Sequence, residues 1–182
     1  MKRLLVAVLL ASCLKLPAQE TRREVSHAHA DPAIDAKPNS PDVPDVFAVS
    51  GHLERIVVLR FKFGTDLLAG LEKMIAQEKI KNAVILSAFG SVRGYQVHQV
   101  SNRDLPSKDL FVKNPTAPAD IIGMSGMVMN GRVHPHITLA DADKAFGGHL
   151  EPDTQVFTFA VITLGVLDDS IDMSRFDDST YR

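Results

Sequence analysis

Hydrophobic residues follow two different periods at the start of the predicted folded region, and each period predicts one element. Residues 56–63 (IVVLRFKF) pass from an apolar run to alternation, which predicts a β-strand. Between residues 67 and 78, apolar side chains recur at helical spacing, so one face of a helix would be buried there. Thr65 or Asp66 can cap this helix, because a short oxygen-bearing side chain accepts a hydrogen bond from a free backbone N–H.

Most of the remaining apolar segments also predict strands. The run AVILSAF is nearly continuous and therefore suits a central strand that is buried on both faces. The last run, QVFTFAVITLGVL, suits the centre of a sheet or a subunit interface. A long surface loop is expected between residues 102 and 119, which hold three prolines and several charges. The strands predicted in addition to the first occupy residues 83–89, 95–100, 120–129, 133–139 and 155–167.

The N-terminal end has the pattern of an export signal. Two cations precede an apolar run, residues 4–14, that is too short to span a bilayer, which needs about 20 apolar residues. Cleavage after Ala18 would make residues 1–18 a signal peptide and the protein periplasmic or secreted. The alternative is a lipoprotein anchored at Cys13, because residues 10–13 (LASC) resemble a lipobox. The short apolar run favours ordinary cleavage.

Composition divides the rest of the chain into three parts. Residues 19–50 are rich in proline and aspartate and have no hydrophobic period, so a disordered linker is expected. We interpret His27 and His29 as linker residues, because a flexible segment does not hold two imidazoles in place for a metal. One domain is expected at residues 51–167, followed by an acidic C-terminal tail, residues 168–182, that should fray. The single cysteine lies in the export signal, so the remaining protein cannot form a disulfide.

A histidine-rich stretch, residues 131–150, carries the clearest indication of chemistry. His134 and His136 would point to one face of a strand, with Cα atoms about 6.6 Å apart. The Gly147-Gly148 pair permits close backbone approach and can bring His149 back to them. Three neutral imidazoles without a thiolate suit Zn²⁺ or another divalent transition metal, and they leave one position open for water or substrate. The alternative is a set of hydrogen-bonded strand histidines, which are more common than ligands.

A second candidate site follows the strand expected at residues 83–89. Gly90 and Ser91 are small enough to let a ligand approach the backbone, and Arg93 offers a planar fork for a carboxylate or phosphate. These three residues are therefore candidates for substrate binding. A plain turn with a solvated arginine at residues 90–94 explains the same pattern equally well.

Together these motifs resemble the PPC family, the "plants and prokaryotes conserved" domain. The resemblance implies an α/β (α+β) fold: a mainly antiparallel sheet with one main helix packed on it, usually assembled as a homotrimer. It also implies a metal held through His134, His136 and His149. The fold is similar to that of acetolactate decarboxylase, whose metal is held by a comparable set of histidines. The resemblance covers about residues 55–167 and rests on Gly90-Ser91-Val92-Arg93, Ser125-Gly126, His134-Pro135-His136, Leu139-Ala140-Asp141 and Gly147-Gly148-His149-Leu150.

Other residues would support the expected metal. Asp141 or Glu151 could orient an imidazole through its second nitrogen. Arg93 could steer an anionic substrate, and we interpret His98 as structural, although it could reach the pocket. Members of the family often carry a glutamate near the start of the strand that begins here with Asp120, so whether a carboxylate serves the site stays open.

The charge balance argues against a nucleic-acid partner. The formal net charge is −2, and loss of residues 1–18 would remove three cations and no acids, which gives −5. Nucleic acid is bound mainly through lysine and arginine, and the sequence has no basic stripe. DNA binding would therefore come only from association with the plant members, whose domain follows AT-hook motifs. Two hypotheses remain: a metal-site protein that binds or transforms a small molecule, enzyme or not, and a non-catalytic trimeric interaction module.

Overall fold

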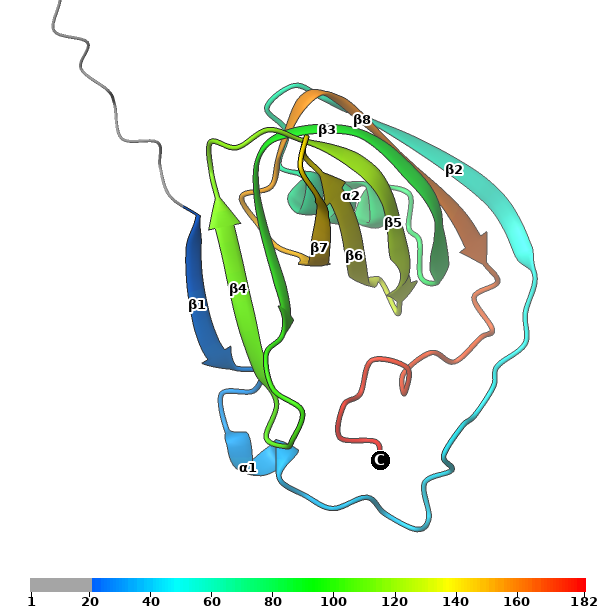
Figure 1. The fold of residues 1–182 in the computed structure, drawn as a ribbon. Helices are drawn as coiled ribbons and strands as arrows, with labels where there is room; N and C mark the ends of the chain where they lie inside the picture. The colour runs from blue at the N-terminus through cyan, green and yellow to red at the C-terminus, as the bar shows by residue number, and fades with distance from the viewer. Residues whose placement is uncertain (1–20) are drawn as a thin grey trace, which may run out of the picture.

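Eight strands and two helices make up the part of the chain that the computed structural model describes, residues 21–182 (Figure 1). The expected signal peptide and the lipobox cysteine, Cys13, lie outside these residues. Among the described residues, neither helix is long and apolar enough to cross a membrane. The elements are β1 (Arg22–His27), α1 (Pro32–Asp35), β2 (Leu53–Lys62), α2 (Leu67–Gln77), β3 (Ala83–Val100), β4 (Lys108–Asn114), β5 (Ala119–Met129), β6 (Arg132–Ala140), β7 (Ala145–Leu150) and β8 (Gln155–Leu167).

The strands form one curved sheet in which the paired strands are antiparallel. β3 is its central strand: the first half pairs with β5 and β8, and the second half pairs with β4 and β7. Because β5, β6 and β7 pair in succession and β7 returns to β3, these four strands close into a ring. The expected class, a mainly antiparallel sheet with one main helix, is confirmed.

Helix α2 forms where the helical period predicts it and fills the concave side of the sheet (Figure 1). Asp66 is its N-cap, and the carboxylate accepts a hydrogen bond of 2.9 Å from the backbone N–H of Ala69. Leu67, Leu71 and Ile75 are at most 2% exposed and pack in the main core with side chains of the sheet. Burial of each such side chain stabilises the fold by about 1.5–3 kcal/mol.

Strand β3 is longer than the sequence predicts. The turn considered at residues 90–94 does not occur, because Gly90 pairs with Ile121 of β5 on one side and Ala160 of β8 on the other. A Cβ atom at Gly90 would lie 2.3 Å from a carbonyl oxygen of β8, and its φ of +140° is one that other residues rarely adopt. The glycine therefore serves close strand packing, and the strand continues to Val100.

Two strands lie in segments predicted to be irregular. β4 occupies part of the loop expected at residues 102–119, and β1 lies in the segment expected as a disordered linker, residues 19–50. β4 pairs with β3 on one side and with β1 on the other. All six residues of β1 are exposed, so backbone hydrogen bonds to β4, rather than burial, hold this edge strand in place.

The acidic C-terminal tail, residues 168–182, also differs from the expected frayed end. Ile171 and Met173 are 7% and 2% exposed and pack with Met129 of β5 in a second, smaller core. These apolar side chains lie among five aspartates, so the acidic composition of the tail does not reveal that part of it is buried.

Predicted strands at residues 56–63, 120–129, 133–139 and 155–167 are confirmed to within three residues at each end.

Candidate metal centre

The ring of strands brings four histidines to one face of the sheet. His136 of β6 is the direct cross-strand partner of His149 of β7, and His149 is in turn the partner of His98 of β3. Directly paired residues project to the same face, so these three side chains form a row across three strands. His134 lies two positions from His136 on β6 and shares that face.

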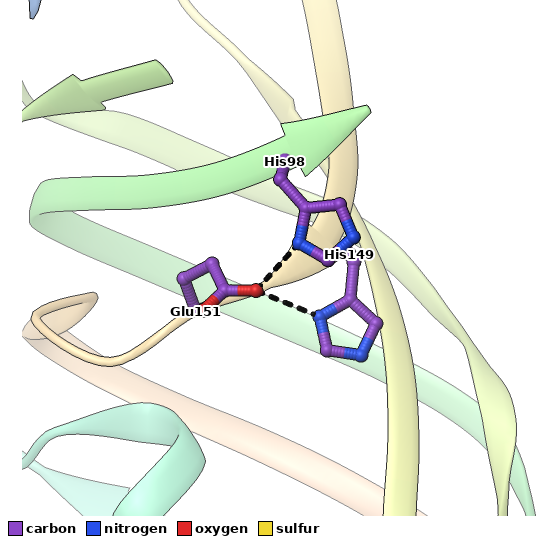
Figure 2. Close-up of side chains that lie close together, drawn as sticks. All are labelled: His98, His149 and Glu151. Carbon is purple, nitrogen blue, oxygen red and sulfur yellow. Dashed lines mark hydrogen bonds and ion pairs between the residues drawn. The ribbon is translucent and has the colours of Figure 1, made fainter. Parts of the chain in front are cut away.

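The four imidazoles are arranged as two stacked pairs that meet at nearly right angles. The rings of His98 and His149 lie 4.7 Å apart with planes inclined by 23° (Figure 2). Those of His134 and His136 lie 5.2 Å apart at 20°. His134 and His149 link the two pairs through an edge-to-face contact of 4.7 Å at 88°. Residues from three strands thus place eight ring nitrogens in a small volume.

Two carboxylates fix the orientation of three of these rings. Glu151, directly after β7, places one oxygen 2.6 Å from Nδ1 of His98 and 3.1 Å from Nδ1 of His149 (Figure 2). Asp177, in the C-terminal tail, lies 2.7 Å from Nδ1 of His134. A carboxylate accepts a hydrogen bond, so each Nδ1 carries a hydrogen, and in the neutral ring Nε2 then keeps its lone pair. This is the tautomer in which a histidine binds a metal through Nε2.

The geometry of His134 and His136 suits a common metal ion. Their Nε2 atoms are 3.2 Å apart. Two nitrogens bound tetrahedrally at 2.0–2.1 Å lie about 3.4 Å from each other, so little movement is needed. The same separation suits a hydrogen bond from Nε2–H of His136 to Nε2 of His134. These two nitrogens therefore fit two ligand positions of a borderline divalent metal, with the hydrogen bond as the metal-free counterpart.

Among the described residues, one group of three has all its ligand atoms close together, and it is not the set predicted from the sequence. His98, His149 and Glu151 offer ligand atoms that all lie within 4.8 Å of one another, so they could also hold a metal ion. The 2.6 Å between Nδ1 of His98 and the Glu151 oxygen is, however, too short for two ligands of one tetrahedral ion, which stand about 3.4 Å apart. In this conformation Glu151 acts as a hydrogen-bond acceptor that orients both rings.

The surroundings favour the neutral form of two of the histidines. Burial lowers the pKa of His149 below its usual value, and the neighbouring His98 and His134 lower it further, against a smaller opposing effect of Glu151. Burial also lowers the pKa of His136, again with a contribution from the adjacent histidines. Both effects favour the unprotonated ring that a metal requires.

The structure brings some of the predicted site residues together. His134, His136, His149 and Glu151 lie in one cluster. Asp141 does not lie against an imidazole in the described contacts: its carboxylate accepts hydrogen bonds from the backbone N–H groups that follow it in the β6–β7 turn.

The predicted substrate residues lie at a different place. Gly90 and Ser91 line a cleft of about 620 Å³ with Asp120 and Asp141. The Arg93 guanidinium stacks on the ring of Phe63, 5.1 Å from its centre. Gly90 lies eight residues before His98 on β3, so this cleft is separate from the histidine cluster.

Two members of the cluster were not among the predicted site residues: His98 was interpreted as structural, although able to reach the pocket, and Asp177 had no expected role. His98 lies in an alternating segment that predicts a strand. Its pairing with His149, however, depends on the closure of the ring of strands between β7 and β3, which are about fifty residues apart in the sequence. Asp177 is one of several aspartates in the tail, and no spacing distinguishes it from the others. Alternation on the strand was the only signal for His98, and there was none for Asp177.

Comparison with known proteins identifies the family. Residues 48–168 match the family model described as the Plants and Prokaryotes Conserved (PCC) domain, the family also written PPC. The match covers well over half of the chain, and the chain therefore belongs to this family.

Curated relatives match part of the chain, and solved structures share its fold. A bifunctional GlmU protein of Synechococcus sp. (strain JA-3-3Ab) is 31% identical over 111 residues, which cover 60% of this chain but only 17% of the relative. A solved PPC protein of Pyrococcus horikoshii has a TM-score of 0.55 at 19% identity, over 68% of this chain and 85% of its own. A metal-containing protein of Archaeoglobus fulgidus has a TM-score of 0.57 at 24% identity, over 74% of this chain and 95% of its own. These structures share the fold of this chain.

Proposed function

We propose that the protein binds a divalent transition metal through His134, His136 and His149, and that the metal site binds or transforms a small molecule. The observation that carries this proposal is the pair of hydrogen bonds from Nδ1 of His134 and of His149 to carboxylates, which leave both Nε2 atoms as metal donors. The 3.2 Å approach of Nε2 of His136 to Nε2 of His134 supports it. The metal content of the Archaeoglobus fulgidus neighbour agrees with it.

Zn²⁺ or another divalent transition metal suits this donor set, because such ions bind imidazole nitrogen. Three imidazoles without a thiolate leave one tetrahedral position for water or a substrate oxygen. A metal ion bound there supplies Lewis-acid chemistry, which polarises a carbonyl or lowers the pKa of bound water. Glu151 would keep His149 in the required tautomer, and His98 would share that carboxylate as a neighbouring base.

A second function, a non-catalytic interaction module, is favoured by an exposed apolar face on β2, β3, β5 and β8. Phe89 and Phe159 contact each other there at 6.2 Å, although they are 52% and 36% exposed. Val58 and Ile122 are 65% and 61% exposed. Apolar patches of this kind mark interaction surfaces. We propose that this face assembles the protein as a homotrimer, the state that the family resemblance implies.

Export remains part of the proposal. Residues 1–18 have the composition of a cleavable signal, which would make the protein periplasmic or secreted, and Cys13 offers the lipoprotein alternative. Mass spectrometry of the mature N-terminus separates the two routes. A chain beginning at Gln19 supports cleavage, whereas a lipid-bearing Cys13 supports the anchor.

Metal analysis of the purified protein tests the main proposal. The expected result is about one ion per chain, because the three histidines form one site with an open position. A His134→Ala/His136→Ala variant should lose the ion while its circular dichroism spectrum stays that of the folded protein. A wild-type protein that holds no metal after incubation with Zn²⁺ and dialysis would contradict the proposal.

A further inference from the structure

The C-terminal tail, residues 168–182, lies almost wholly outside the segment that matches the family model, which ends at residue 168. It nevertheless packs against the domain. Figure 1 shows it, in red, running back from the end of β8 toward α1. Ile171 and Met173 are buried, and the fully buried Asn82 donates a hydrogen bond of 2.9 Å to the carbonyl oxygen of Ile171. The tail is therefore anchored before it reaches the histidine cluster.

The segment before the domain holds the tail from the other side. Phe47 packs on Phe176 and Tyr181 at 4.9 and 5.8 Å between ring centres. The backbone N–H of Ser40 donates a hydrogen bond of 2.8 Å to the carbonyl oxygen of Arg182. The segments on either side of the family domain, residues 21–47 and 169–182, thus pack on each other as well as on the sheet. Phe176 is the immediate neighbour of Asp177 in the sequence.

Asp177 connects this packing to the histidine cluster. One of its oxygens lies 2.7 Å from Nδ1 of His134, and the other accepts a hydrogen bond of 2.6 Å from the guanidinium of Arg132. The Asp177 side chain is 22% exposed, whereas that of Arg132 is 71% exposed. An ion pair with so exposed a partner contributes little to docking. The apolar anchors at Ile171 and Met173 can therefore keep the tail in place without the Asp177 carboxylate.

We propose that Asp177 is a positioning residue for the metal site, supplied by the C-terminal extension rather than by the family domain. By accepting the hydrogen of Nδ1, it holds His134 in the tautomer whose Nε2 faces His136. The inference rests on the proposed metal function. It adds that the C-terminal tail, residues 168–182, orients one of the proposed metal ligands.

The first test is the tautomer of His134 in the metal-free protein, read from long-range ¹H–¹⁵N NMR correlations. The wild-type protein should show the hydrogen on Nδ1, and Asp177→Ala should lose this preference. Asp177→Asn should keep part of it, because the amide oxygen still accepts a hydrogen bond. Asp169→Ala is the matched control, since it removes an acidic residue of the same tail that is exposed and contacts Lys81 through its backbone oxygen. An unchanged tautomer in Asp177→Ala would overturn the inference.

The second test is Zn²⁺ affinity, measured by competition with a chromophoric chelator. Asp177→Ala should bind Zn²⁺ about 10- to 100-fold more weakly, the usual cost of losing a partner of a metal-bound imidazole. Asp177→Asn should lie between this variant and the wild-type protein, and Asp169→Ala should match the wild type. Equal affinities for Asp177→Ala and wild type, with binding lost in His134→Ala, would overturn the role of Asp177 and leave the metal site standing. Failure of the wild-type protein to bind Zn²⁺ would overturn both.

Discussion

His98 of β3 and His149 of β7 stand directly opposite each other in the sheet, and their Nδ1 atoms share one oxygen of Glu151. The two rings lie stacked at 4.7 Å with planes inclined by 23°, and both direct Nδ1 at this oxygen. Glu151 is 17% exposed, so water competes weakly for that oxygen. A single acidic side chain thus sets the orientation of two imidazoles.

Loss of the Glu151 carboxylate should weaken metal binding. In Glu151→Gln the amide oxygen can accept only as a neutral group, so both rings lose a charge-assisted partner. Zn²⁺ affinity should fall by about 10- to 100-fold, as measured by competition with a chelator. Asp153→Asn is the control, because Asp153 is 64% exposed and pairs with Lys113 rather than with a histidine. Equal affinities in the two variants would show that Glu151 does not serve the metal.

A side chain at Gly126 should strain the pairing of β5 with β6, the strand that carries His134 and His136. Its φ is +131°, and a Cβ atom would lie 2.1 Å from the backbone oxygen of His134. Gly126→Ala should lower the free energy of unfolding by about 1–3 kcal/mol, the usual cost of a strained backbone position. Denaturant unfolding measures it. Gly123→Ala on the same strand is the control, because nothing lies within 4 Å of a Cβ built there. Equal effects at both positions would refute the strain at Gly126.

Acid should lower the stability of the fold in part through Asp35, which accepts hydrogen bonds from Ser107. The side-chain hydrogen bond from Ser107 holds the pKa of Asp35 below its usual 3.8, against the opposing effect of burial. In the unfolded chain this carboxyl takes up a proton at a higher pH than in the folded one. Its contribution to stability is therefore present above about pH 3.8 and is lost as pH falls through the lower folded pKa.

The measurement for Asp35 is the free energy of unfolding as a function of pH, in the wild-type protein and in Ser107→Ala. The variant lacks the hydroxyl that donates at 2.6 Å, so its loss of stability in acid should be smaller. Identical acid dependence in the two proteins would assign the effect to other carboxylates.

The exposed apolar face should hold the protein together as an oligomer. Phe89→Asp places a charge in this face and should convert the assembly to monomers, because burying an unpaired charge costs far more than an apolar contact contributes. Light scattering after size-exclusion chromatography measures the mass. Val25→Asp is the control, since Val25 is 56% exposed on edge strand β1, away from the face. A monomeric wild-type protein would contradict the proposed trimer.

Local patterns predicted the elements that local interactions stabilise. Helix α2 and its Asp66 cap follow from spacing and capping chemistry within one segment. β8 follows from an uninterrupted apolar run. β4 was missed because its alternation is short and lies among prolines and charges, so pairing with β3 and β1 decides its conformation. The tail was missed because two buried side chains among aspartates do not change its composition.

The sequence by itself determined which histidines of β6 and β7 are candidate metal ligands, since the strand period puts His134 and His136 on one face and the glycine pair allows His149 to approach. Only the tertiary structure decided the rest of the cluster. His98 joins it because the ring of strands closes between β7 and β3. Asp177 joins it because Ile171 and Met173 of the tail are buried in the second core with Met129. Periodicity acts over a few residues, whereas strand closure and tail docking depend on contacts between segments more than forty residues apart, which no local pattern records.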